Sequence, residues 1–320
     1  MSVVLALALR LLPPCVAVLL GYVAGGTAVF ARRPDAIAAL NGYVLYVAFP
    51  LLIVLGTADP SHAVPTHPAF YLAHLALFAA WVPALAILGR SAGSVRDELG
   101  AIALGAIFGN IAYVGLPFIV SVLGDESVGL ASVGVALHVA LAMTLGPALL
   151  LRWQGGERRG LALVARRLVR QPLVWAPLVG LLLRSLPASV LEHLLPPLAP
   201  VAASAPPVAL FMLGLYLRAN TTALRSLDAP ALVLSAGKLL ASPALALALA
   251  WPLWRAGLID ALEARVFVLL AAVPTAIAAF SLAHELALGE ATVARGIVLT
   301  TVLSLVSLPL VGALTLALIA

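Results

Sequence analysis

One apolar run of this chain contains the stretch Gly109-Asn110-Ile111-Ala112-Tyr113-Val114-Gly115-Leu116-Pro117, and the run itself extends from about Asp97 to Leu123. The stretch would place glycines, a proline and an amide inside a membrane helix, where lipid offers no hydrogen-bond partner. Each unsatisfied backbone group costs several kcal/mol in hydrocarbon, so a break is tolerated only where it is buried in protein or lines a wet cavity. The stretch therefore predicts a binding site.

A second interrupted segment, Val273-Pro274-Thr275-Ala276, lies in a later apolar run. One offset of 165 positions places Gly109 on Pro274 and Asn110 on Thr275. Two interrupted hydrophobic segments at corresponding places in two halves of a chain are typical of the substrate site of a secondary transporter. The pair predicts that the two breaks act together.

The composition is that of a polytopic membrane protein. The 320 residues are 63% hydrophobic and 10% charged, with a mean hydropathy of +1.15, whereas soluble domains are about 45–50% apolar and about 25% charged. Although the formal net charge is +5, the basic residues form no stripe with interleaved aromatics, so we expect no nucleic-acid partner. The single Cys15 cannot form an intramolecular disulfide, and no Cys/His cluster predicts a metal or cofactor.

Ten spans are predicted, at about 20 residues for each membrane helix. Their approximate ranges are 8–30, 36–58, 68–89, 97–122, 128–151, 171–187, 195–217, 229–254, 262–286 and 292–318. The predicted fold is an all-α membrane protein in which spans 4 and 9 are broken.

The basic residues predict the orientation of these spans. Loops after the odd-numbered spans hold 13 arginines against 4 on the opposite side, so the positive-inside rule places the odd loops in the cytoplasm and both termini outside the cell membrane. Residues 152–170 form the most basic loop and would link two five-helix repeats, 1–151 and 171–320. Because five is odd, the second repeat would be inverted.

Three stretches resemble the auxin efflux carrier family of membrane transporters, which includes the plant PIN-like carriers and bacterial members. They are Asn41-Gly42-Tyr43-Val44-Leu45-Tyr46-Val47-Ala48-Phe49-Pro50 in span 2, Gly109-Asn110 through Gly115-Leu116-Pro117 in span 4, and Val273-Pro274-Thr275-Ala276 followed by Gly289 and Ser304-Leu305-Val306-Ser307-Leu308-Pro309 in spans 9 and 10. Together they extend over nearly the whole chain.

The resemblance implies two inverted five-helix repeats whose broken spans 4 and 9 cross at mid-membrane. It also implies a scaffold of spans 1, 2, 6 and 7, which can mediate a homodimer, and a transport domain of spans 3–5 and 8–10 that moves by an elevator-like step. It also implies a small organic anion as substrate, either auxin or a carboxylate such as malate or malonate. The chain departs from the family pattern at Ile111-Ala112, where Thr-Gly is common, and at Ala278, where an Asn is common. A more apolar site and a different ligand are expected from these departures.

The second half of a broken helix presents free N–H groups, equivalent to about half a positive charge. Two such ends, after Pro117 and after Pro274, would meet at the crossing and suit a carboxylate without a buried arginine. We expect Asn110 and Thr275 to contact the substrate, since their side chains both donate and accept hydrogen bonds.

The other expected site residues complete the crossing. Tyr113 would add ring contact or a hydroxyl, Ala276 belongs to the second interruption, and the breaks would be shaped by Gly109, Gly115, Pro117 and Pro274. The alternative is that these residues only kink and pack two helices.

Two ionisable residues inside spans are candidates for coupling or gating. Lys238 in span 8 lies at a depth where an ionisable residue is functional by default, and its alternative is snorkelling toward the cytoplasmic face or pairing with a helix-end carbonyl. His138 in span 5 changes charge near neutral pH, and its alternative is a packing histidine.

The expected function is secondary active or facilitative transport. The main alternative is a sodium-coupled bile-acid-type symporter, which would need acidic and amide ligands clustered at the crossing, where mid-span acidic residues are absent. A membrane-embedded enzyme would need a metal cluster or a nucleophile constellation, and none is recognisable, so we expect no catalytic residues. A channel is compatible with the composition.

Overall fold

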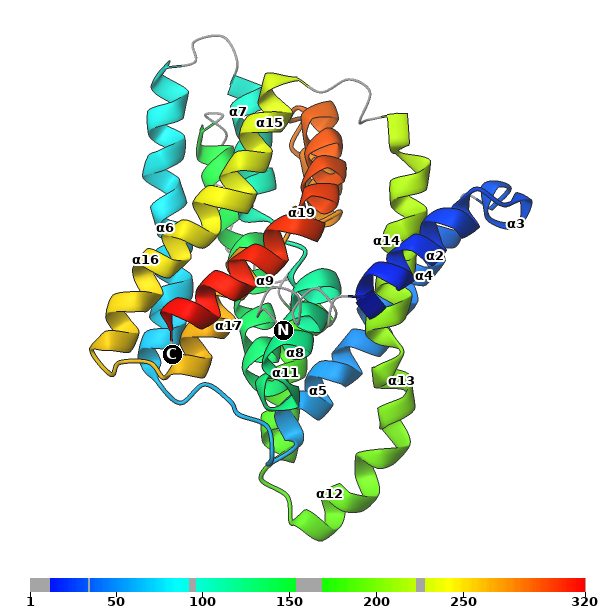
Figure 1. The fold of residues 1–320 in the computed structure, drawn as a ribbon, viewed down its shortest axis with the longest axis vertical. Coiled ribbons are helices and arrows are strands. Elements are labelled where there is room, and N and C mark those ends of the chain that lie inside the picture. The colour runs from blue at the N-terminus through cyan, green and yellow to red at the C-terminus, as the bar shows by residue number, and fades with distance from the viewer. Residues whose placement is uncertain (1–11, 34, 92–95, 154–168, 223–227, 320) are drawn as a thin grey trace. The chain divides into compact units, whose positions relative to one another are not determined.

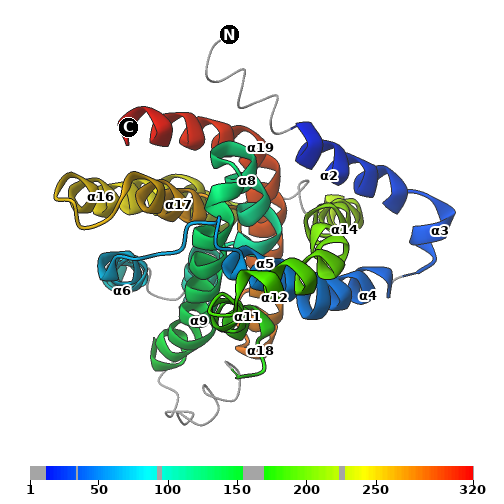
Figure 2. The same cartoon turned by 90° about the horizontal axis from the view of Figure 1, so that it is seen from below.

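The computed structural model describes residues 12–33, 35–91, 96–153, 169–222 and 228–319 of the 320-residue chain. Helices and short connections make up these residues, and within them a β-bridge pairs only Gly109 with Thr275. The elements are labelled in Figure 1, and Figure 2 gives a second view. Most of the expected linker, 154–168, and the start of the first expected span, 8–11, lie outside the described residues.

The helices of the first half follow the expected spans closely. In chain order they are α2 (Leu12–Gly25), α3 (Ala28–Ala31), α4 (Ala36–Tyr43), η1 (Val44–Ala48), α5 (Phe49–Ala58), α6 (Pro68–Ser91), α7 (Arg96–Ile107), η2 (Ile111–Gly115), α8 (Leu116–Leu123), η3 (Asp125–Ser127) and α9 (Val128–Trp153).

The second half is also built of helices with short interruptions. Its elements are α11 (Pro172–Leu183), α12 (Ala188–Leu194), η4 (Pro196–Leu198), α13 (Ala199–Ala203), α14 (Ala205–Ala219), α15 (Ala229–Ala236), η6 (Gly237–Ala241), α16 (Ser242–Arg255), α17 (Ala261–Ala271), α18 (Ala278–Glu285) and α19 (Glu290–Leu318).

Within the described residues, five continuous helices are long and apolar enough to cross a membrane. They are Ala36–Ala58, Asp125–Thr144, Ala188–Ala219, Ala229–Arg255 and Glu290–Leu318. Shorter apolar helices lie at Pro13–Gly25, Pro68–Trp81, Glu98–Ile107, Ile111–Leu123 and Pro172–Leu183. The chain is therefore an all-α, multi-pass membrane protein.

Three π-helical segments stand directly before a proline at the second position of the next helix. They are Val44–Ala48 before Pro50, Ile111–Gly115 before Pro117, and Gly237–Ala241 before Pro243. In a regular α-helix a proline ring clashes with the carbonyl four residues earlier and removes a hydrogen bond. A wider π turn accommodates the ring, and such turns are frequent at functional sites.

The chain divides into two compact units. Unit 1 is Met1–Thr66, Ala112–Ala136 and Gln171–Thr221, and unit 2 is His67–Ile111, Leu137–Arg170 and Thr222–Ala320. Unit 1 thus contains the helices of the expected scaffold together with residues 112–136. The division of labour between a scaffold and a transport domain stays a prediction.

Glycines bring helices of unit 1 into backbone contact. A Cβ added at Gly21 of α2 would lie 1.9 Å from the carbonyl oxygen of Phe211 in α14, and one added at Gly214 would lie 2.1 Å from that of Val18. Figure 1 shows α2 and α14 side by side. At Gly180 of α11 a Cβ would lie 1.9 Å from Oγ1 of Thr57 in α5. Small residues that allow such close approach are typical of helix packing in membranes.

Unit 2 has its own buried core, where α6, α16 and α17 meet. α16 and α17 lie next to each other in Figure 2. Leu234 of α15 is fully buried and fills the space left by Gly105 of α7 and Gly296 of α19, where a Cβ would lie 2.4 and 2.7 Å from its side chain. The core of α6, α16 and α17 includes Phe70, Ala73, Leu77, Ala246, Ala250, Ala264, Phe267, Val268 and Ala271.

Candidate functional site

Two interruptions of the helices lie against each other in unit 2. The first is 108–110, between α7 and the helix that begins at Ile111, and the second is 272–277, between α17 and α18. Gly109 and Thr275 are opposed in an antiparallel bridge. Two main-chain hydrogen bonds join the interruptions, from Asn110 N to Pro274 O at 2.7 Å and from Ala276 N to Phe108 O at 2.8 Å.

Gly109 and Pro274 explain why both segments leave the helix here. A Cβ added at Gly109 would lie 2.8 Å from Cγ2 of Val273 and 3.1 Å from Nζ of Lys238, so the close approach needs glycine. Pro274 has no N–H to continue α17, and it disfavours helical backbone at the residue before it. Its carbonyl still accepts the hydrogen bond of the bridge.

The helix after the first interruption begins earlier than expected. We expected free N–H groups after Pro117, but the helix starts at Ile111, and Pro117 lies inside it at the second position of α8. Gly115 is the last residue of the π segment that accommodates this proline. The free N–H groups therefore belong to the first turn from Ile111 onward. After the second interruption, α18 begins at Ala278.

Thr275 holds the interruptions to neighbouring helices. Its side chain is fully buried, and Oγ1 donates to the carbonyl of Gly105 in α7 at 2.9 Å. Its backbone N donates to Oγ1 of Thr300 in α19 at 3.1 Å. The Thr275 hydroxyl proton is thus used within the protein, and a contact between this residue and substrate stays a prediction.

Asn110 is the contrasting case. Its side chain is 5% exposed, and within the described residues Nδ2 has no hydrogen-bond partner. A buried donor without a partner costs about 1–3 kcal/mol. An acceptor group of a ligand would remove this cost by accepting a hydrogen bond from Nδ2. Asn110 lies directly before the helix start at Ile111, and its backbone N–H donates to the second interruption.

Basic side chains bond the carbonyl ends of the half-helices that lead into the two interruptions. Lys238 is fully buried, and its Nζ donates to the carbonyl of Ala271, the last residue of α17, at 3.1 Å. His138 is 3% exposed, and its Nε2 lies 3.2 Å from the carbonyl of Ile107, the last residue of α7. Since a carbonyl only accepts, Nε2 carries the proton, and Nδ1 has no partner in the described part of the chain.

Tyr113 belongs to unit 1. Its hydroxyl donates to Oδ1 of Asn41 at 2.7 Å, and its ring stacks on Phe49 with centroids 5.3 Å apart and planes 4° from parallel. Only 9% of the Tyr113 side chain is exposed. Its expected contact with substrate stays a prediction.

Residues 7–311 match the protein family described as membrane transport protein, which is the auxin efflux carrier, PIN-like, family. The chain belongs to this family. None of the curated proteins compared with the chain matches it. The predicted resemblance is confirmed, and membership in the auxin efflux carrier family makes the chain a membrane transporter.

Sequence reasoning missed several residues that form hydrogen bonds with the expected site residues of this carrier-family member. Gly105 and Thr300 bind Thr275, and Asn41 binds Tyr113. Asn41 is the first residue of one of the stretches that resemble the family, and Thr300 is a polar residue in a long apolar run. Both residues could therefore have been identified from the sequence. Gly105 contributes only a carbonyl, which no residue type reveals.

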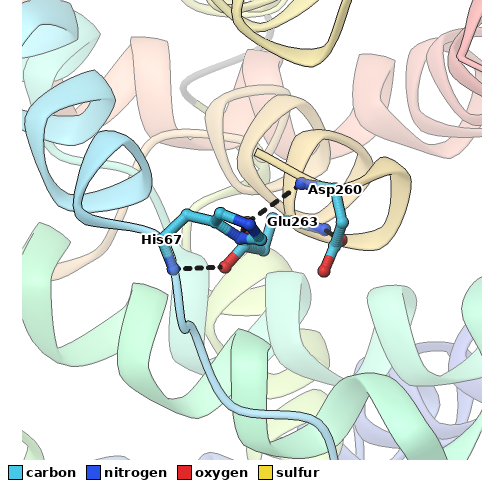
Figure 3. A network of polar contacts seen from close by, with 3 residues as sticks. All are labelled: His67, Asp260 and Glu263. Atoms are coloured by element: carbon cyan, nitrogen blue, oxygen red, sulfur yellow. Dashed lines mark hydrogen bonds and ion pairs between the residues drawn. The ribbon is translucent and has the colours of Figure 1, made fainter. Parts of the chain in front are cut away.

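A cluster of potential metal ligands, also unforeseen, lies near the start of α17. His67, Asp260 and Glu263 point toward one another in Figure 3, and one ligand atom of each lies within 4.8 Å of the others. Oε2 of Glu263 accepts from the Asp260 backbone at 3.1 Å and lies 2.7 Å from Nδ1 of His67. The Glu263 backbone donates to Oδ1 of Asp260 at 2.7 Å. The contacts between Asp260 and Glu263 form a capping box that fixes the helix start, and the ring and backbone N–H of His67 bond the Glu263 carboxylate.

Proposed function

We propose that the chain is a secondary carrier for a small organic anion, which binds with its carboxylate at the paired interruptions. The observation that carries this proposal is the buried amide of Asn110, whose Nδ2 has no partner among the described residues. It lies between the helix start at Ile111 and the interruption before α18. Helix N-termini favour anions through free N–H groups and the helix dipole.

The buried charge at the same place has the sign that an anion requires. Lys238 approaches Gly109 of one interruption and bonds the end of α17 before the other. No carboxylate within the described residues forms an ion pair with it. A sodium-coupled bile-acid-type symporter, the alternative function, would instead need acidic oxygen ligands at the crossing.

The inverted repeat is part of the proposal. Shifting the opposed pair Gly109 and Thr275 by the 165-residue offset gives Pro274 and Asn110, which are the neighbouring opposed pair of the bridge. Two antiparallel segments related in this way are expected at the pseudo-two-fold axis of an inverted repeat. Ten spans and elevator-type movement of a transport domain against a scaffold are also part of the proposal, and the family resemblance supports them.

Uptake into proteoliposomes tests the proposal. The purified protein is reconstituted, and initial uptake of radiolabelled malonate, malate and indole-3-acetate is measured in sodium and in choline buffer, with and without a proton gradient. Saturable uptake of at least one anion is expected from a carrier. Uptake that rises in proportion to concentration would indicate a channel, and uptake only with a sodium gradient would favour the symporter.

The variant Asn110→Ala tests the proposed substrate site in the same uptake assay. We expect it to lower uptake at least tenfold, whereas Asn220→Ala, which removes an amide at the end of α14, should leave uptake near the wild-type value. Asn220 bonds only locally, with Nδ2 donating to the carbonyl of Tyr216 at 2.9 Å. Uptake unchanged by Asn110→Ala would contradict the proposed site.

A further inference from the structure

Lys238 is an unusual residue for the interior of a membrane protein. It is fully buried in the π-helical segment between α15 and α16. Removing an ammonium from water costs several kcal/mol unless partners compensate it. Within the described residues its Nζ has one hydrogen-bond acceptor, the carbonyl of Ala271. A charge kept at this cost needs a reason beyond packing.

The position of Nζ supplies that reason. Ala271 ends α17, and the last carbonyls of a helix lack intrahelical partners and carry the negative end of the helix dipole. Nζ would also lie 3.1 Å from a Cβ added at Gly109. The Lys238 ammonium therefore bonds the end of one half-helix and lies beside Gly109 of the other interruption.

This is the environment in which coupled carriers bind their cation. In discontinuous helices, unwound carbonyls and the C-terminal ends of half-helices coordinate sodium ions or protons near the substrate site. Here the end of α17 is bonded by Lys238, and the end of α7 is bonded by His138.

We propose that the Lys238 ammonium is a tethered cation that takes the place of a dissociable coupling cation at the paired interruptions. As a covalent part of the protein, the ammonium compensates the carbonyl end of α17 without dissociating and leaves the site with a positive charge for an anion. The consequence for anion transport rests on the proposed function, whereas the cation site itself does not. Removal of the side chain would then create a binding site for a small monovalent cation.

Cation rescue tests this inference. Lys238→Ala and the wild type are purified in detergent, and their melting temperatures are compared in methylammonium, sodium and choline chloride at equal ionic strength. The wild type should melt at the same temperature in all three salts. Lys238→Ala should melt lower in choline and regain several degrees in methylammonium or sodium, because a ligand that binds only the folded state stabilises it.

Two variants separate charge from volume. Lys238→Met fills the space without a charge and should show no response to either cation. Ser235→Ala, one turn earlier on α15, removes only a local bond from Oγ to the carbonyl of Ala231 and should also show none. If Lys238→Ala does not fold in choline, the yield of monodisperse protein in methylammonium against choline gives the same readout.

Equal melting temperatures, or equal yields, of Lys238→Ala in methylammonium, sodium and choline would overturn the inference. So would a sodium-dependent melting temperature of the wild type. Neither outcome depends on finding the transported anion. A wild-type protein that carries no carboxylate but whose Lys238→Ala variant is rescued by cations would reject the proposed function and keep the tethered cation.

Discussion

Asn110 and Thr275 occupy corresponding positions in the sequence, but their side chains differ in hydrogen bonding. The Thr275 hydroxyl is bonded to α7, and its backbone N–H is bonded to α19, so this residue ties the interruption into unit 2. The Asn110 backbone holds the bridge while its side-chain N–H has no partner in the described part of the chain. The sequence offset predicted which residues correspond. It could not predict which hydroxyl or amide is already bonded, because that depends on carbonyls of distant helices.

Asn110→Asp gives a sharper test of the site than removal of the side chain. The substitution keeps the shape of the side chain but replaces the unpartnered donor by an anionic acceptor, which repels a carboxylate. We expect at least a tenfold loss in apparent affinity for the transported anion, or about 1.4 kcal/mol. Uptake kinetics measure it, with Asn220→Asp as the matched control. Wild-type affinity in Asn110→Asp would show that the amide does not face substrate.

At the scale of elements, helix positions followed from apolar runs, but two features did not. The three π segments arise from prolines at the start of the following helices, and the sequence shows the prolines without showing how the turn before them widens. The close contacts of α2 with α14 and of α5 with α11 depend on glycines whose partners are far away in sequence. Hydropathy predicts that a helix exists, but it does not predict which face of the helix packs closely against another helix.

Gly21→Ala should destabilise unit 1. The added Cβ would lie 1.9 Å from the Phe211 carbonyl oxygen, which is backbone and cannot rotate away. Overpacking typically costs about 1–3 kcal/mol, and we expect the melting temperature in detergent to fall by several degrees. Gly42→Ala in α4 is the control, because a Cβ there meets nothing within 4 Å and alanine favours the helix. A melting temperature of Gly21→Ala equal to that of Gly42→Ala would disprove the close contact.

At the scale of the whole molecule, membership in the auxin efflux carrier family and an all-helical, multi-pass architecture were predictable, because composition and apolar runs reflect the bilayer. The division of the chain into two compact units could not be predicted from the sequence. Residues 112–136 join unit 1, although the helix break that starts at residue 108 begins in unit 2. A boundary between units inside one interrupted span depends on packing between helices, which hydropathy does not contain.

The excess of arginines in the odd loops predicts that both termini lie outside the cell membrane. Cys15 is the only cysteine, so Cys15→Ala gives a background for single-cysteine labelling. We expect Ser185→Cys, after α11, to react with a membrane-impermeant maleimide in intact cells. Thr222→Cys, after α14, should react only after permeabilisation. Both side chains are exposed. The reverse pattern would mean the opposite orientation.

The bridge between the interruptions is made by main-chain atoms alone. No exchange of one side chain for another deletes either of its hydrogen bonds, except the introduction of proline at Asn110 or Ala276, the two residues whose N–H groups donate. The side chains of Asn110 and Ala276 can therefore change to residues other than proline while the bridge persists, whereas the close approach of Val273 keeps Gly109 a glycine. In the proposed carrier, the side chains that contact the substrate are thus separate from the main-chain hydrogen bonds that hold the two interruptions together. A single substitution can then alter substrate recognition without breaking the bridge.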